Sequence, residues 1–231
     1  MRGAGCTVND MYDIDIDRRV IRTRNRPLAS GALQKKDALL WLGAQLGLSS
    51  LILFTLNSQT IVLGLLALSF VGTYPIMKRI TSYPQFHLGI TINMGVLMGY
   101  SAAAGHLAFA PFALYSAAIC WTMIYDTIYA HQDKKDDKAI GVKSTALTYG
   151  EDTLKVCSNF TTAMGMSLFL AGLATGMGPS FFATTFMASC MILRGLSVVD
   201  LDKPQSCWEF FVMNRNIGLL IFIGVLTGHF I

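Results

Sequence analysis

Charge is scarce in this chain, and the scarcity narrows its class. Only 14% of the 231 residues are Asp, Glu, Lys or Arg, whereas 53% are hydrophobic. Soluble domains carry about 25% charged residues, so this chain has too little polar surface for a soluble globule. We therefore expect an integral membrane protein, with the lipid bilayer as a partner and no nucleic acid.

Cysteine pairs at disulfide or metal-ligand spacing are missing as well, and so are targeting segments. The cysteines are five in number, widely separated and without a CxxC pair: Cys6, Cys120, Cys157, Cys190 and Cys207. This excludes a disulfide framework or a cysteine-ligated metal site. No cleavable signal or transit segment is visible. The opening residues are small and apolar with one Arg, and resemble the last turns of a transmembrane helix, so we expect a fragment or a short isoform.

Long apolar runs make up most of the rest. Seven stretches are each near the roughly 20 residues that cross a bilayer as a helix. They cover residues 38–56, 60–77, 86–107, 111–130, 158–176, 181–199 and 210–231. The sequence predicts an all-α, multi-pass transmembrane bundle of about seven spans, forming a single domain over residues 1–231.

The connections between these stretches alternate in charge. Those around residues 57–59, 105–110 and 176–180 carry no Lys, Arg, Asp or Glu. All 18 basic and 14 acidic residues then fall on or near one membrane face, with Arg194 and Arg215 close to span ends. By the positive-inside rule that face is cytoplasmic or matrix. A conduction pathway would show polar groups at both ends, so the pattern disfavours a transporter.

Two acid-rich blocks lie at the edges of apolar stretches. Their acids recur at helical intervals, so each set lines one helix face. Mg²⁺ prefers oxygen ligands and is typically held by one or two carboxylates plus a substrate phosphate. We predict metal ligands at Asn9, Asp10, Asp13 and Asp17 in the first block and Asp126, Asp133 and Asp137 in the second, with Asp13, Asp17, Asp133 and Asp137 as catalytic residues. Solvated helix caps are the structural alternative.

The same order of acidic and basic residues occurs twice in the chain. Each acid block is followed by a basic stretch, and an offset of 116 residues places Asp10 over Asp126 and Asp17 over Asp133. This predicts two related half-bundles around a central cavity, with motif regions at 9–36 and 126–155. Because Arg grips two oxygens and Lys acts as a point charge, the diphosphate candidates are Arg22, Arg26, Lys78, Arg79 and Lys143. Binding of lipid headgroups is the alternative for such residues.

These motifs resemble those of the UbiA-type intramembrane aromatic prenyltransferases. Residues 9–31, NDMYDIDIDRRVIRTRNRPLASG, are similar to the NDxxDxxxD block plus RTxxRPLxxG of that family, and residues 126–147, DTIYAHQDKKDDKAIGVKSTAL, to its second DxxxD block. Residues 74–85 resemble the loop between them. The likeness spans much of residues 1–150, whereas residues 158–231 match mainly in hydropathy. The motifs are most similar to the branch that acts on 4-hydroxybenzoate.

The resemblance implies a fold, a reaction and a location. It implies a nine-helix bundle, of which this chain retains the last seven helices and lacks the first. It implies Mg²⁺-dependent transfer of a polyprenyl group from polyprenyl diphosphate to the ring of 4-hydroxybenzoate in ubiquinone synthesis. The expected site is the mitochondrial inner membrane with the active face toward the matrix, or the cytoplasmic side in a bacterium. A ubiquinone-synthesis complex is a further expected partner.

Three further residues receive a role beside this resemblance. Arg2 lies seven residues before Asn9, on the same helix face and deeper, where a cation needs a partner. We assign it to the benzoate carboxylate, with a frayed terminal residue or a topology signal as the equal alternative. Tyr129 is a substrate-binding candidate. His131 is expected to be a solvated loop residue, because Mg²⁺ prefers oxygen ligands.

Other functions stay open. The metal-binding motifs indicate only the diphosphate donor, so homogentisate, a naphthoate or haem could be the acceptor. An inactive truncated isoform would carry the same motifs. A CDP-alcohol phosphotransferase would also use Asp residues and Mg²⁺ at the membrane edge, but its DGxxAR…GxxxDxxxD arrangement is absent from the sequence. A transporter would explain the acids at helix ends, yet the uncharged opposite face offers it no second gate.

Overall fold

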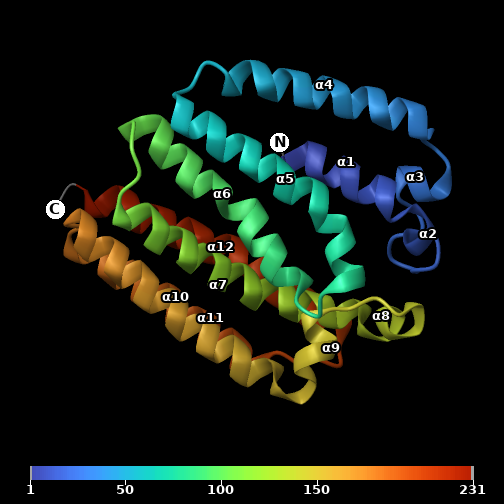
Figure 1. Ribbon diagram of the computed structural model, residues 1–231. Coiled ribbons are helices and arrows are strands. Elements are labelled where there is room, and N and C mark those ends of the chain that lie inside the picture. Colours follow the sequence, from blue (N-terminus) through green and yellow to red (C-terminus); the bar gives the residue numbers. More distant parts are fainter. Residues whose placement is uncertain (1, 230–231) are drawn as a thin grey trace.

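The chain folds into a bundle of antiparallel helices (Figure 1). The computed structural model describes residues 2–229, apart from the side chain of Arg2. Within that range every regular element is helical, which confirms the all-α prediction. The long helices are α4 (Lys35–Leu53), α5 (Ser58–Ile80), α6 (Pro84–Ala104), α7 (Phe109–Ala130), α10 (Thr153–Thr175), α11 (Pro179–Val198) and α12 (Pro204–Gly228). Each overlaps one of the seven predicted stretches.

The shorter helices gather at one end of the bundle, on the right in Figure 1. They are α1 (Arg2–Tyr12), α2 (Ile14–Asp17), α3 (Pro27–Ser30), η1 (His131–Asp133), α8 (Lys134–Ile140), α9 (Thr145–Tyr149) and η2 (Gly150–Asp152). The three uncharged turns, α4–α5, α6–α7 and α10–α11, lie at the opposite end. The two acid blocks and both basic stretches therefore share one end, as the charge pattern predicts.

Among residues 2–229, four segments are long and apolar enough to cross a membrane, against the seven spans expected: Ser58–Ile80, Thr145–Thr175, Pro179–Val198 and Pro204–Gly228. The second of them includes α9 and η2 ahead of α10. The largest boundary difference from the sequence prediction is at α12, which begins at Pro204, six residues before the expected start. Proline is favoured at the first position of a helix, where its missing N–H costs nothing. As a result Arg215 lies in the middle of α12, not close to its end as expected.

One proline and one glycine shape the site end. Pro75 lies inside α5, and the helix changes direction near its C-terminal end (Figure 1), since an internal proline removes a hydrogen bond and clashes with the preceding turn. This bend brings Lys78 toward α1. On the other side of the site, Gly141 ends α8 with a φ of 79°, a left-handed conformation that glycine adopts at no steric cost.

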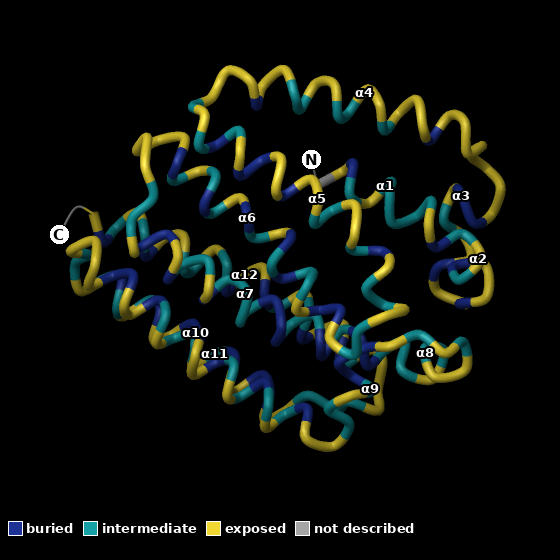
Figure 2. Tube along the Cα trace, viewed as in Figure 1, coloured by how far each residue is buried: buried dark blue, intermediate teal, exposed yellow. Residues whose placement is uncertain are grey.

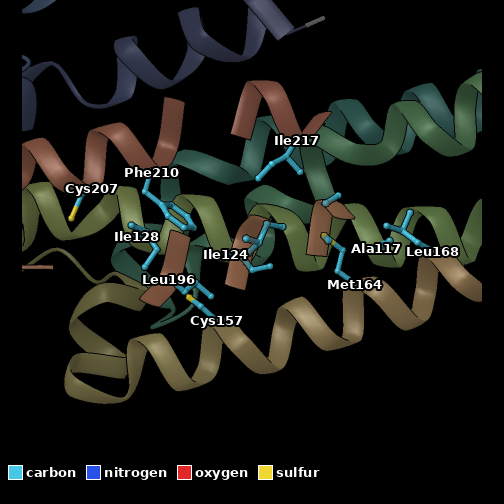
Figure 3. Packing of buried hydrophobic residues seen from close by; sticks show 12 residues of the cluster. Ala117, Ile124, Ile128, Cys157, Met164, Leu168, Leu196, Cys207, Phe210 and Ile217 are labelled. Atoms are coloured by element: carbon cyan, nitrogen blue, oxygen red, sulfur yellow. The ribbon is translucent and has the colours of Figure 1, made fainter. Parts of the chain in front are cut away.

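The best-packed core lies between α7, α10, α11 and α12 (Figure 3). Ile124 and Ile128 of α7, Met164 of α10 and Ile217 of α12 are fully or almost fully buried. By contrast α4 packs mainly along α1 and α5, and most of its length is exposed (Figure 2). Its exposed side chains include Leu40, Trp41, Leu48 and Leu51, which is the expected surface of a helix that faces lipid.

Candidate active site

An aspartate interrupts the helix in both acid blocks. α1 ends at Tyr12, and Asp13 follows with φ −96° and ψ 8° before α2 begins. Asp133 has φ −100° and ψ 3° ahead of α8. Both values lie in the sparsely populated bridge region, where many active-site residues are found. Asp13 and Asp133 therefore share one backbone conformation at the point where each acid block breaks its helix.

The first block is neutralised by cations from two different segments. Arg26 donates from Nη1 to Asp10 Oδ1 and to Asp17 Oδ2, both at 3.0 Å. Lys78 of α5 lies 3.3 Å from Asp13 Oδ2. Asp13 and Asp17 are almost fully buried, at 2% and 5% exposure. Burial raises the pKa of Asp17 despite the opposing charge of Arg26.

Arg22 joins the first basic stretch to the second acid block. Its Nε donates to Asp133 Oδ1 at 3.0 Å and its Nη2 to Asp133 Oδ2, a two-pronged pair. Its Nη1 donates to Tyr129 Oη at 2.6 Å, and its guanidinium carbon lies 5.2 Å from the centre of the Tyr129 ring. Burial works against the charged guanidinium, but the hydrogen bond and charge of Asp133 raise the pKa of Arg22 overall.

Asp126 and Asp137 complete the second block. The charge of Lys78 acts on both carboxylates as well as on Asp13. Burial, followed by the charge of Asp133, raises the pKa of Asp137 to about 6, although Ser144 hydrogen-bonds to its side chain. Lys78 therefore pairs with Asp13 of the first block, and its charge also acts on two acids of the second block.

Two of the predicted diphosphate residues hold backbone carbonyls in place of acids. Arg79 donates from Nη2 to the carbonyl of Tyr12 at 3.3 Å. Lys143 donates from Nζ to the carbonyl of Ile80 at 3.2 Å, and its backbone N–H bonds to the carbonyl of Lys78 at 2.9 Å. Both are exposed at the rim of the acid blocks. The predicted role of the Arg2 side chain lies outside the described residues.

An aromatic group borders the second block. Tyr125 and Tyr129 of α7 meet Phe211 of α12, with ring centroids 5.7 Å and 4.6 Å apart. Trp208 stacks on Phe211 at 5.7 Å and lies 6.2 Å from Tyr129. We call these four side chains the aromatic wall. Sequence reasoning selected only Tyr129, because Trp208 and Phe211 lie in the stretch that is informative mainly in hydropathy.

The structure corrects the expectation for His131 and adds Thr23. His131 is 6% exposed, not solvated, and its Nε2 lies 3.0 Å from Thr153 Oγ1. Burial, then Lys134, lowers the pKa of its imidazole to about 4. Thr23 is buried and donates to the carbonyl of Asp17 at 3.2 Å. Neither contact has a sequence signal, because each depends on how a short helix folds back.

The donor set suits a hard cation. Asn9 Oδ1 and Asp13 Oδ1 are buried oxygens without a hydrogen-bond partner in the described structure, and leaving such acceptors unpaired is costly. Within residues 2–229 no three His, Cys, Asp or Glu side chains lie close enough to hold a metal by themselves. Mg²⁺ needs no such cage, since it keeps waters and takes substrate phosphate oxygens. The residues fit a Mg²⁺ bound together with a phosphate-bearing ligand.

Solved structures resemble the whole bundle. A UbiA homolog from Aeropyrum pernix K1, in its apo form, superposes with a TM-score of 0.86 at 26% identity, covering 98% of this chain and 84% of that one. A UbiA homolog from Archaeoglobus fulgidus, described as bound to GPP and Mg²⁺, has a TM-score of 0.69 at 20% identity and covers 96% of this chain and 82% of that one. At that identity the second likeness concerns the fold alone.

Curated relatives match almost the entire chain. Proteins named mitochondrial 4-hydroxybenzoate polyprenyltransferase are 46% identical in Drosophila melanogaster, 46% in Bos taurus and 44% in Homo sapiens, each over 99% of this chain. The chain spans only 58–62% of the length of these relatives. A family profile described as the UbiA prenyltransferase family matches residues 1–219. This chain therefore belongs to the UbiA prenyltransferase family.

Proposed function

We propose that this chain transfers a polyprenyl group from a polyprenyl diphosphate to the ring of 4-hydroxybenzoate, as a step of ubiquinone synthesis. One observation carries the proposal. At a single end of the bundle, seven of the predicted metal-binding and diphosphate-binding residues form ion pairs: Arg22 with Asp133 across the two motif blocks, Arg26 with Asp10 and Asp17 inside the first block, and Lys78 of α5 with Asp13. The names of the curated relatives support the choice of acceptor.

The metal would be held by oxygen donors from both blocks. Asn9, Asp10, Asp13 and Asp17 form one donor set, and Asp126, Asp133 and Asp137 form the other. The orphaned oxygens of Asn9 and Asp13 support the first set. When bound, Mg²⁺ supplies positive charge that neutralises the departing diphosphate.

The basic residues would exchange partners when the donor binds. Arg22, Arg26 and Lys78 leave carboxylates for diphosphate oxygens, since both anions suit the same donors. Arg79 and Lys143 stand at the rim, where they help to close the site. Arg2 remains the sequence-based candidate for the benzoate carboxylate. The donor's apolar tail lies among the helices, in contact with the bilayer.

The reaction then balances as an electrophilic aromatic substitution. The bond between C1 of the prenyl group and the diphosphate oxygen breaks, and the electron pair leaves with the diphosphate. The ring carbon next to the phenol hydroxyl forms a bond to C1, and the ring proton passes to an aspartate or to the released diphosphate. Tyr129 and its aromatic neighbours keep water from the allylic cation, which would otherwise become an alcohol.

The site faces one compartment. The relatives' mitochondrial names and the one-sided charges support a location in the mitochondrial inner membrane with the active face toward the matrix. A ubiquinone-synthesis complex is a further proposed partner.

Reconstituted membranes test the function. Wild type, Asp13→Ala, Asp133→Ala and the control Asp15→Ala receive a polyprenyl diphosphate, labelled 4-hydroxybenzoate and Mg²⁺. Asp15 is a suitable control because its side chain is 88% exposed. We expect prenylated product from wild type and control, lost by at least roughly a hundredfold in the other two variants, as for removal of a key electrostatic group. Metal-independent product, or equal activity in all four proteins, would contradict the proposal.

A further inference from the structure

Two polar side chains meet inside the apolar part of the bundle. Trp121 of α7 donates from Nε1 to Oδ1 of Asn214 of α12 at 2.7 Å. Asn214 is buried, and its Nδ2 donates to the carbonyl of Phe210 in its own helix at 2.8 Å. Trp121 lies five residues before Asp126, about 8 Å along α7 at 1.5 Å per residue. Asn214 lies equally far beyond Glu209 on α12. The pair therefore joins two helices below the charged end of the bundle.

The indole of Trp121 is fixed by more than this hydrogen bond. A Cβ at Gly218, one turn beyond Asn214 on α12, would lie 2.9 Å from Cη2 of Trp121, so the ring packs directly on the helix backbone. Trp121 meets Tyr125 edge-on, with ring centroids 6.0 Å apart and planes at 86°. Loss of the Asn214 oxygen would leave a buried N–H without its partner, which is costly. Asn214 and Gly218 therefore set the angle at which Trp121 meets Tyr125.

The hydroxyl of Tyr125 has a polar contact of its own. Its Oη lies 3.3 Å from Oγ1 of the buried Thr122. Asn93 of α6 donates from Nδ2 to the same Thr122 oxygen at 2.9 Å, and to the carbonyl of Ala118 at 3.1 Å. Asparagine and threonine side chains form such bridges between helices in membranes. Side chains from α6, α7 and α12 therefore fix the position of one tyrosine.

Tyr125 connects these polar contacts to the acid blocks. Its ring lies 5.7 Å from that of Phe211, and the Phe211 ring lies 4.6 Å from that of Tyr129. Tyr129 accepts a hydrogen bond from Arg22, whose guanidinium pairs with Asp133. Each step of this path is a direct contact between side chains. The aromatic wall therefore extends from the second acid block down to the anchored indole.

We propose that Asn214 is a positioning residue that acts through Trp121 to hold the aromatic wall closed against water. The inference rests on the proposed function, in which the wall shields the allylic end of the donor. If water reaches the cation, its oxygen bonds to C1 and it loses one proton to the diphosphate, which gives the prenyl alcohol. An indole without its anchor lets Tyr125 and Phe211 move, so a larger share of the cation reacts with water.

A purely structural role for the pair makes a different prediction. Hydrogen bonds between membrane helices can serve only to hold the helices together, and damage to the reaction then follows damage to stability. The double variant Trp121→Phe/Asn214→Leu separates the two roles. Removing both partners leaves no unpaired polar group and can be nearly neutral for stability, whereas the wall still lacks its anchor.

The test measures how products divide in reconstituted wild type, Asn214→Leu, Asn214→Gln, the double variant and Thr161→Val. Thr161 is the matched control, a buried residue of α10 whose hydroxyl donates to the carbonyl of Cys157 in its own helix. Each protein receives labelled polyprenyl diphosphate, Mg²⁺ and 4-hydroxybenzoate. We expect the share of prenyl alcohol among the products to rise at least roughly fivefold in Asn214→Leu and in the double variant. Asn214→Gln should restore part of the wild-type ratio, and Thr161→Val should keep all of it.

Two readouts need no prenyl transfer. The unfolding midpoint of the double variant should return toward wild type although its alcohol share stays high. Acrylamide quenching of Trp121 fluorescence, in a chain with Trp41→Phe and Trp208→Phe, should increase with Asn214→Leu but not with Thr161→Val. That increase supports the inference even if wild type forms no prenylated benzoate, an outcome that would sink the proposed function alone. The inference is overturned if the alcohol share follows the unfolding midpoint across all variants, or if Asn214→Leu leaves the quenching unchanged.

Discussion

At the scale of single residues, the buried acids of the first block are paired with basic side chains. Each buried carboxylate of the first block has a cation within 3.3 Å, supplied by Arg26 or Lys78. A buried acid without such a partner would be costly. Arg26 and Lys78 are also proposed to bind diphosphate. In the free site they instead pair with the carboxylates that are proposed to bind the metal.

Arg26→Gln should therefore make the metal site more accessible. Without the guanidinium, Asp10 and Asp17 are available to a metal ion. We expect the variant to bind Mn²⁺ roughly tenfold tighter than wild type in the absence of diphosphate, a difference of about 1.4 kcal/mol in binding free energy. Prenyl transfer should nevertheless fall. Electron paramagnetic resonance of free Mn²⁺ measures the affinity. Arg24→Gln, an exposed neighbour, is the control, and unchanged Mn²⁺ affinity in Arg26→Gln would refute the competition.

His131 gives the fold a dependence on pH. Its pKa is lowered to about 4 in the folded chain, against about 6.5 when unfolded. Between these values the unfolded chain binds more protons, so the contribution to stability is complete above about pH 7 and is lost as pH falls toward 4. At pH 5 the loss is about 2 kcal/mol.

Thermal unfolding in detergent at pH 7.5 and pH 5, with a chelator present, measures this effect. His131→Asn keeps a polar side chain but cannot titrate, so we expect it to lose less stability than wild type over the same interval. His106→Asn, at an exposed position, should behave as wild type. An identical pH response in wild type and His131→Asn would show that another group is responsible.

At the scale of helices, close approach depends on glycine. A Cβ at Gly172 of α10 would lie 2.6 Å from Cε1 of Phe181 and 2.9 Å from Cε1 of Phe182 in α11. Phe181 is 1% exposed, so its ring has little room to move. The α10–α11 turn, and with it the start of the well-packed half of the bundle, depends on the absence of a side chain there.

Gly172→Val should destabilise the chain by about 1–3 kcal/mol, the usual cost of overpacking a core. Gly43→Val on α4 makes the same chemical change where no other atom lies within 4 Å of the added Cβ, and we expect it to be nearly neutral. The difference between the two unfolding midpoints isolates the packing term. Equal midpoints would mean that Phe181 can shift without cost.

At the scale of the whole molecule, periodicity and charge carried most of the prediction. The apolar stretches gave the seven long helices, because burial in lipid requires continuous apolar length. The site was predictable where acids and bases stand in motifs, as with Asp13 and Arg22. It was not predictable for Phe211, His131 or Thr23, since their partners come from distant elements through packing that no local pattern encodes.

The one-sided charge distribution predicts the topology in a membrane. In a chain with its five cysteines replaced, single cysteines at Lys35 and Lys138 should react with a membrane-impermeant maleimide from the same side of sealed vesicles. A cysteine at Ser58, the first residue of α5 beside the α4–α5 turn, should react only from the other side. All three positions are exposed. Labelling of all three from one side would contradict a single charged face.

The Arg22–Asp133 pair also bears on how inherited substitutions in this chain should be interpreted. It joins residues 111 positions apart, so the two motif blocks are not independent targets of mutation. Loss of Arg22 leaves Asp133 without its ion-pair partner, and loss of Asp133 leaves Arg22 with only its hydrogen bond to Tyr129. Changing both residues should cost less stability than the sum of the single changes. The loss of stability caused by a substitution in one block therefore depends partly on which residue is present in the other block.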